Sequence, residues 1–378
     1  MESRNTNKLS HPYFENLTGL RAIGALSVFL FHAFLENSDN WGEFYSSSTM
    51  QVITKIFSKG NYGVSLFFVL SGFLITYLLL HEAKVNKQIN VFGFFMRRLL
   101  RIWPLYFLIV GFGFLIYPHF IGGVHTSNSP VMYSLFLSNF EEIFNGFRDP
   151  VNMLTITWSV SIEEQFYISW VLLMVLFPFM RKGKGFLPYF LLLIVVSLVF
   201  RWYLRSDYTA LYYHTCTVMS DLAIGGILAY SCFRYHIQQR LQQIPRSFNL
   251  IAYPLGIALI VGSRFVFQGD LIVIEKVVIG IFFAYIIFDQ AFGKHSVLKV
   301  DKVPLLFQLG TISYGFYMYH IIVLHYLHTL VFEHYLNESI FYFLLYILLA
   351  FAFTYVISYL SYHYFEKPIL RLKKSFQA

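Results

Sequence analysis

The chain has 378 residues, of which 57% are hydrophobic and only 13% are charged. An average soluble domain is about 25% charged, so this composition excludes an ordinary soluble protein and predicts a polytopic membrane protein. The net charge of +8 does not indicate a nucleic-acid partner, because the basic residues are scattered over short loops and form no single patch. With only two cysteines, no disulfide framework or cysteine metal cluster is expected.

Apolar stretches long enough to cross a bilayer occur about ten times along the chain. The expected fold is therefore all-α, with about ten transmembrane helices in one bundle. We expect a single transmembrane domain over 1–378, with no appended soluble domain. The segment 118–162 is too polar to span the membrane but apolar enough to fold back onto the bundle. The expected spans are 17–35, 62–80, 101–117, 163–180, 186–204, 216–233, 249–267, 271–288, 305–328 and 339–364.

Lysine and arginine are concentrated in alternate loops of this arrangement. Every loop on the side of the N-terminus is richer in them than its neighbours on the opposite side. Because basic loops remain in the cytoplasm, we expect both termini to be cytoplasmic. Arg21 then lies toward the cytoplasm, and His32 lies in the outer half of the membrane.

The first apolar helix carries Arg21 near its start and His32 near its end. Their separation of eleven residues corresponds to three turns plus roughly 20°, so both side chains share one face about 16 Å apart. An ionisable group inside a membrane needs a partner or water, and both residues are therefore functional candidates. The alternative is that Arg21 extends to the interface and His32 is a hydrogen-bonded packing residue.

Two further patterns carry candidate residues. Arg98 and Arg101 are three positions apart, so on a helix they point the same way and could grip a phosphate or diphosphate together. The alternative is an ordinary basic cluster at a helix end. Ser159, Glu163 and Tyr167 recur every four residues and predict one polar stripe, in which a carboxylate could orient a neutral imidazole. The alternative there is capping of a helix start.

Other polar positions give weaker signals. Asp221 lies in an expected span, and Glu275 and Lys276 could neutralise each other within the bundle. His320 is as compatible with a hydrogen-bonded core histidine as with a ligand. The sequence contains no His-x-x-x-His pair, no paired cysteines and no acidic triplet, so no metal site is expected.

Taken in order, these motifs resemble acyltransferase family 3, whose members are integral-membrane O-acyltransferases typified by O-antigen acetylases. The resemblance covers almost the whole chain. One position departs from the pattern, because members commonly carry an aspartate where this chain has Thr18. The matching motifs are Arg-x10-His (Arg21 and His32), Ser-Gly-Phe-Leu (71–74), Arg-x-x-Arg (Arg98 and Arg101), Trp-Ser-x-Ser-x-Glu-Glu-Gln-Phe-Tyr (158–167), Ser-Tyr-x-x-Tyr-x-Tyr-His (313–320) and Glu-Lys-Pro (366–368).

The resemblance implies an enzyme of the bacterial cytoplasmic (inner) membrane that takes an acyl group from cytoplasmic acyl-CoA, most commonly acetyl-CoA. Arg21, Arg98 and Arg101 would meet the phosphates of the donor. His32 would act as general base, or would carry the acyl group covalently, with Glu163 orienting it and Ser159 beside it as a further catalytic candidate. The acceptor would be a hydroxyl of a carbohydrate or lipid-linked glycan.

Two other functions remain open from the residues alone. Ten spans and an aromatic-rich bundle also suit a transporter or flippase of a polysaccharide or lipid-linked sugar. A protein that acts only through interactions would tolerate the loss of His32. Transport of a neutral sugar requires no pair of cytoplasmic arginines opposite an outer histidine, so the pattern favours the transferase. The oligomeric state is left open.

Overall fold

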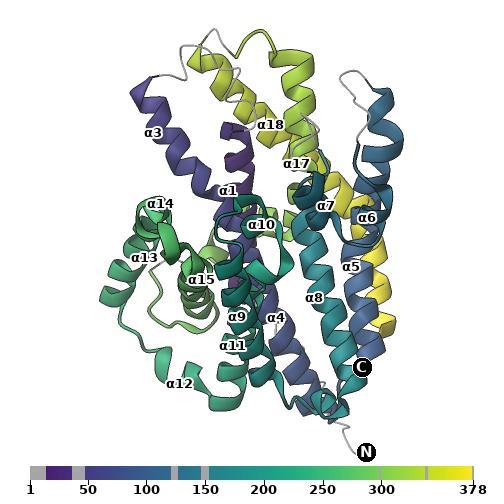
Figure 1. Ribbon diagram of the computed structural model, residues 1–378, viewed down its shortest axis with the longest axis vertical. Helices are drawn as coiled ribbons and strands as arrows, with labels where there is room; N and C mark the ends of the chain where they lie inside the picture. Colours follow the sequence, from purple (N-terminus) through teal and green to yellow (C-terminus); the bar gives the residue numbers. More distant parts are fainter. Residues whose placement is uncertain are drawn as a thin grey trace, which may run out of the picture.

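The computed structural model describes residues 14–35, 47–120, 127–145, 153–297, 299–336 and 339–376. Every regular element in these segments is helical, and the long helices run roughly side by side (Figure 1). The α-helices are α1 (Glu15–Leu35), α3 (Ser48–Phe57), α4 (Tyr62–Asn86), α5 (Val91–Gly111), α6 (Pro130–Ser134), α7 (Ser138–Asn145), α8 (Thr157–Leu176), α9 (Phe186–Tyr203), α10 (Tyr208–Tyr213), α11 (Thr215–Tyr235), α12 (Ile237–Leu241), α13 (Arg246–Val261), α14 (Ser263–Val266), α15 (Glu275–Phe292), α16 (Pro304–Thr311), α17 (Ser313–Leu327), α18 (Ile340–Ser361) and α19 (Lys367–Arg371).

The number of membrane-spanning helices is close to the expected ten. Eight helical segments of the described chain are long and apolar enough to cross a bilayer. The expected span 249–267 corresponds to α13, which has only 16 residues. The expected span 271–288 corresponds to α15, whose 18 residues include three charged side chains. The protein is thus a multi-pass membrane protein, and ten is an approximate count of its spans.

The expected span 305–328 is wrong as a continuous helix. The chain forms α16, breaks at Ile312, and resumes as α17. The break accompanies a close contact with α1, since a Cβ atom on Gly310 would lie 1.9 Å from the carbonyl oxygen of Thr18. A hydropathy window does not detect this break, because the helices on both sides of it are apolar.

The third span begins ten residues earlier than expected. Asn90 caps α5 by accepting a hydrogen bond from the Gly93 backbone N–H at 2.8 Å. Arg98 and Arg101 therefore lie two to three turns inside α5 and do not flank it. This position carries their side chains into the interior of the bundle.

The described parts of the segment 118–162 fold back onto the bundle, as expected. Ser138 in α7 lies 2.8 Å from the hydroxyl of Ser161 in α8, and the Asn139 amide donates to the carbonyl of Tyr213 at 3.1 Å. These contacts attach α7 to α8 and to the short helix α10. The segment thereby covers the end of α8 at which Ser159 lies.

Hydrogen bonds between residues distant in sequence tie the start of α1 to α15, and α5 to the last described residues. The Asn16 amide donates to the Gln290 carbonyl at 2.7 Å, and Arg97 donates to the Phe376 carbonyl at 2.7 Å. The backbone N–H of Ile89, between α4 and α5, donates to the carbonyl of Arg181 at 2.8 Å. The extreme N-terminal and C-terminal residues lie outside the described segments.

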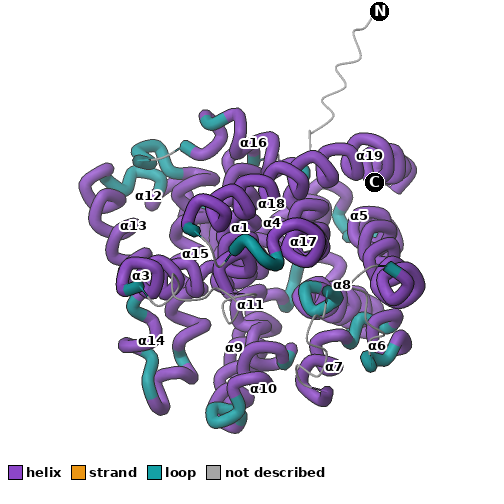
Figure 2. The backbone as a smooth tube through the Cα atoms, turned by 90° about the horizontal axis from the view of Figure 1, so that it is seen from above, coloured by secondary structure: helices purple, strands orange, loops and turns teal. Residues whose placement is uncertain are grey.

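Seen from above, α1 and α4 lie near the centre of the bundle, with α5 and α8 on one side and α13 and α15 on the other (Figure 2). The α4–α11 contact is especially close. A Cβ atom on Gly72 would lie 2.0 Å from the carbonyl oxygen of Leu222, and one on Gly225 would lie 1.9 Å from that of Val69. Small residues let two membrane helices approach in this way.

We therefore expect Gly72→Ala to destabilise the bundle, because the added methyl group meets backbone that cannot rotate away. The loss should be about 3 kcal/mol or more, measured as a lower melting temperature in detergent. Gly111→Ala is the matched control, since no atom of the described chain lies within 4 Å of a Cβ atom there. Equal melting temperatures for the two variants would contradict the close α4–α11 contact.

Buried charges hold α15 against its neighbours. Lys276 donates to the hydroxyl of Ser65 at 2.7 Å and lies 3.9 Å from the carboxylate of Asp221. Glu275 instead pairs with Arg201 at 3.4 Å. The expectation that Glu275 and Lys276 neutralise each other is thus wrong, because adjacent residues of a helix point in different directions.

Candidate functional site

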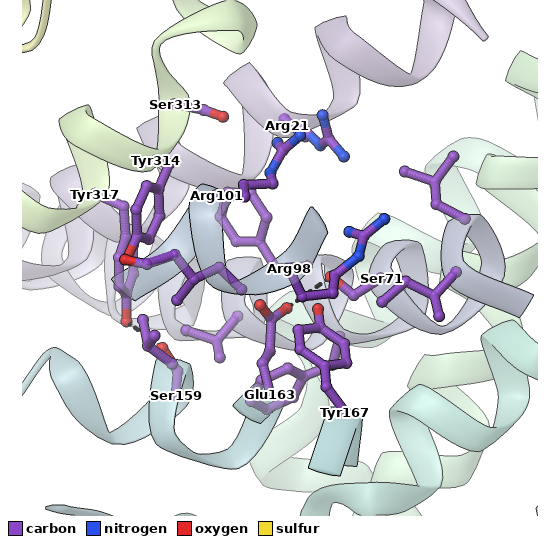
Figure 3. A pocket seen from close by; sticks show the side chains of 17 residues that line it. Arg21, Ser71, Arg98, Arg101, Ser159, Glu163, Tyr167, Ser313, Tyr314 and Tyr317 are labelled. Carbon is purple, nitrogen blue, oxygen red and sulfur yellow. Dashed lines mark hydrogen bonds between the residues drawn. The ribbon is translucent and has the colours of Figure 1, made fainter. Parts of the chain in front are cut away.

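A pocket opens between α1, α4, α5, α8 and α17, with about 790 Å³ of empty space that includes its mouth. Its lining is largely polar on α1, α5, α8 and α17 and mostly apolar on α4 (Figure 3). The polar side chains that line it are Arg21, Ser71, Arg98, Arg101, Ser159, Glu163, Tyr167, Ser313, Tyr314 and Tyr317.

Three arginines from two helices converge on this pocket. Arg98 and Arg101 reach it from one face of α5, as their three-residue spacing predicts, and Arg21 reaches it from α1 (Figure 3). In the described chain, no carboxylate lies within 4.0 Å of any of the three guanidinium groups. The Arg98 Nε atom is buried and has no hydrogen-bond partner there.

Only one acidic side chain, Glu163, is found among the described residues that line the pocket. Its carboxylate accepts a hydrogen bond from the Ser71 hydroxyl at 2.6 Å. Three positive charges therefore face one negative charge in a space partly closed to water. Such an excess, in a fixed arrangement of planar donors, favours a polyanionic ligand such as a phosphate or diphosphate.

The structure brings the polar stripe of α8 to the pocket wall. Ser159, Glu163 and Tyr167 all line the pocket, with Ser159 at one end and the other two facing Ser71 (Figure 3). Glu164 points elsewhere and accepts a hydrogen bond from the indole of Trp103 at 3.0 Å. The four-residue spacing thus identified the face of α8 that lines the pocket.

His32 lies apart from this group and is not among the lining residues. Its ring centre is 5.2 Å from that of His320 in α17. The expectation that Glu163 orients His32 is not supported by this arrangement. Glu163 is grouped with the arginines, whereas the His32 ring packs beside the imidazole of His320.

Tyr317 connects the two groups. Its hydroxyl donates to the Ile156 carbonyl at 3.1 Å and lies 2.8 Å from the Ser159 hydroxyl, at the pocket wall. Its own carbonyl oxygen contacts Nδ1 of His320 at 2.5 Å. Its ring also packs edge-on against Phe67, with centres 6.1 Å apart. Tyr317 therefore stands between the arginine pocket and the histidine pair.

Sequence reasoning missed Ser71, Tyr314 and Tyr317 as lining residues. The motif 313–320 contained a signal for two of them, since Ser313, Tyr314 and Tyr317 are spaced to share one helix face. Ser71 appeared in the sequence only as part of the motif 71–74, to which no catalytic role was assigned. Among the described residues, no cluster of three or more histidine, cysteine, aspartate or glutamate side chains is arranged to hold a metal ion.

Comparison with known proteins identifies one family and several curated relatives. The model of an acyltransferase domain family, acyltransferase family 3, matches residues 14–362. YrhL of Bacillus subtilis is 29% identical over 95% of this chain and 55% of its own length. The peptidoglycan O-acetyltransferase OatA of Listeria monocytogenes is 26% identical over 97% of this chain and 57% of its own length.

A third relative, the O-acetyltransferase OatA of Staphylococcus aureus, is 25% identical over 97% of this chain and 58% of its own length. The chain thus spans a little over half the length of these relatives. No solved structure matches it.

Proposed function

Because the chain belongs to acyltransferase family 3, we propose that it moves an acyl group, in the simplest case acetyl, from acyl-CoA to a hydroxyl of a cell-envelope carbohydrate. The observation that carries this proposal is the pocket in which Arg21, Arg98 and Arg101 meet with no carboxylate of the described residues within 4.0 Å. Transport of a neutral sugar gives no reason for such a concentration of positive charge.

The donor fits this pocket through its phosphates. Coenzyme A carries a diphosphate and a separate phosphate, and guanidinium groups bind such oxygens through paired, charge-assisted hydrogen bonds. Arg98 and Arg101 would hold these groups from α5, and Arg21 would hold them from α1. The flexible arm between diphosphate and thioester would then extend along α1 toward His32.

We assign His32 the role of general base. The acceptor hydroxyl gives its proton to a ring nitrogen of His32 as the oxygen forms a bond to the thioester carbonyl carbon. The tetrahedral intermediate then collapses, the carbon–sulfur bond breaks, and the proton passes from His32 to the thiolate. In a second route the imidazole nitrogen attacks the thioester and carries the acyl group before the hydroxyl takes it.

The membrane sidedness follows from the basic loops. If the basic loops lie on the cytoplasmic side of a bacterial inner membrane, the arginine pocket faces the cytoplasmic donor. His32 then lies toward the outer surface. Both termini are then cytoplasmic. The acceptor is a carbohydrate or lipid-linked glycan, and peptidoglycan is the first to test because the Listeria relative is named for it.

The test is the release of free CoA thiol from acetyl-CoA by the purified protein in detergent, with peptidoglycan fragments or lipid-linked glycans as acceptors. We expect release that depends on the acceptor, together with an acetyl ester on the glycan. Movement of a lipid-linked sugar across liposomes without thiol release would instead support a transporter.

A further inference from the structure

The histidine pair contains one buried nitrogen that the proposed reaction does not yet use. His320 is 1% exposed, and its Nδ1 atom lies 2.5 Å from the carbonyl oxygen of Tyr317. A carbonyl can only accept a hydrogen bond, so Nδ1 must carry the proton. In the neutral ring, Nε2 is then an acceptor with an available lone pair.

That Nε2 atom has no hydrogen-bond partner among the residues that the structure describes. Buried acceptors are normally satisfied, so an unpartnered one points to a group that arrives during function. The neighbourhood is otherwise aromatic, with the ring of Phe29 centred 6.4 Å away. In such apolar surroundings a hydrogen bond formed to Nε2 is strengthened, because water does not compete for it.

The side chain best placed to supply this group is His32. Its ring centre lies 5.2 Å from that of His320, with the ring planes inclined at 53°. A rotation of the His32 ring, or a single bridging water, brings one of its ring N–H groups to Nε2. Hydrogen bonds within catalytic groups are often long before substrate binds and shorten in the complex.

We propose that His320 is a positioning residue for His32, and the inference rests on the function proposed above. Nε2 of His320 accepts a hydrogen bond from one ring nitrogen of His32, which leaves the other nitrogen unprotonated and directed at the acceptor hydroxyl. When that nitrogen takes the hydroxyl proton, the imidazolium keeps its bond to His320. The proton later leaves for the thiolate, and His320 neither gains nor loses one.

Two substitutions at this position separate the proposed role from a structural one. In His320→Asn the side-chain amide can still donate to the Tyr317 carbonyl, but nothing stands in place of Nε2. In His320→Gln the amide oxygen reaches the position of Nε2 and can accept from His32. The first variant therefore preserves the local helix contact, and the second restores the acceptor.

The experiment measures kcat, donor KM and melting temperature for the wild type and both variants in the CoA release assay. We expect His320→Asn to lower kcat by about 100-fold with an unchanged donor KM, since the arginine pocket is not altered. His320→Gln should recover much of the lost kcat. If the Asn variant does not fold, His320→Met replaces it in the comparison with His320→Gln. Methionine has a similar volume but no comparable hydrogen-bond acceptor.

Three results would overturn the inference. An Asn variant with the kcat of an active wild type would show that Nε2 is not used. Equal losses in the Asn and Gln variants, with lower melting temperatures in both, would assign His320 a structural role. A wild type that transfers no acyl group from any donor would remove the proposed function itself, and the positioning role with it.

Discussion

Replacing His32 with alanine is expected to lower the rate of acyl transfer by about 100-fold or more, the usual contribution of a general base. The variant should still fold, because the His32 side chain is only half-buried and its removal leaves a limited cavity. It should also still bind the donor, because His32 does not line the arginine pocket. The rate is measured by CoA release with a saturating glycan acceptor, and donor binding is measured separately.

The matched control is His363→Ala. His363 makes a hydrogen bond to the carbonyl of Tyr359 in α18 at 2.9 Å, on an exposed part of the helix, and does not line the pocket. Its removal should leave turnover unchanged. Wild-type turnover in His32→Ala would exclude His32 from the mechanism, whatever the control shows.

Removing either α5 arginine from the pocket is expected to weaken donor binding by about 1.5–3 kcal/mol, the range for a hydrogen bond to a charged group. This corresponds to roughly a 10- to 150-fold higher Kd for acetyl-CoA. Arg98→Ala and Arg101→Ala should show it in a direct binding measurement without acceptor. Arg98→Lys keeps the charge but loses the planar pair of donors, and should give an intermediate loss.

Arg97 provides the control within the same cluster. Its side chain binds the Glu82 carboxylate at 2.6 Å and the Phe376 carbonyl at 2.7 Å, and it does not line the pocket. Arg97→Ala should therefore leave the donor Kd unchanged in the folded protein. An equal loss of donor affinity in all three alanine variants would indicate a general effect of basic charge. Unchanged affinity in all three would mean that the arginines do not bind the donor and serve only to orient the protein in the membrane.

The parts of this site that lie within one helix could be predicted from the sequence. The spacing of Arg98 and Arg101, and that of Ser159 and Glu163, placed each pair on one face, and the structure brings both faces to the pocket. The helical class and the approximate number of spans followed from hydropathy in the same way. Local periodicity is sufficient for such statements because helix geometry is fixed.

The position of one helix along its neighbour, measured along the bundle axis, could not be predicted. Glu163 was expected beside His32, but the register of α8 against α4 places its carboxylate on Ser71, at the level of the arginines. His320, by contrast, reaches His32 from a helix that is distant in sequence. Such contacts depend on packing between helices, for example on Gly310 against Thr18, and no periodicity encodes them.

In the proposed reaction, one molecule takes its donor at the arginine end of the bundle and delivers the acyl group at the histidine end. Proteoliposomes test it most directly, with acetyl-CoA sealed inside, a glycan acceptor outside, and the fraction of protein in each orientation determined by protease accessibility. We expect acetyl ester on the outer glycan and free CoA thiol in the lumen, both in proportion to the protein whose arginine end faces inward. Transfer that occurs only when donor and acceptor share a compartment would contradict it.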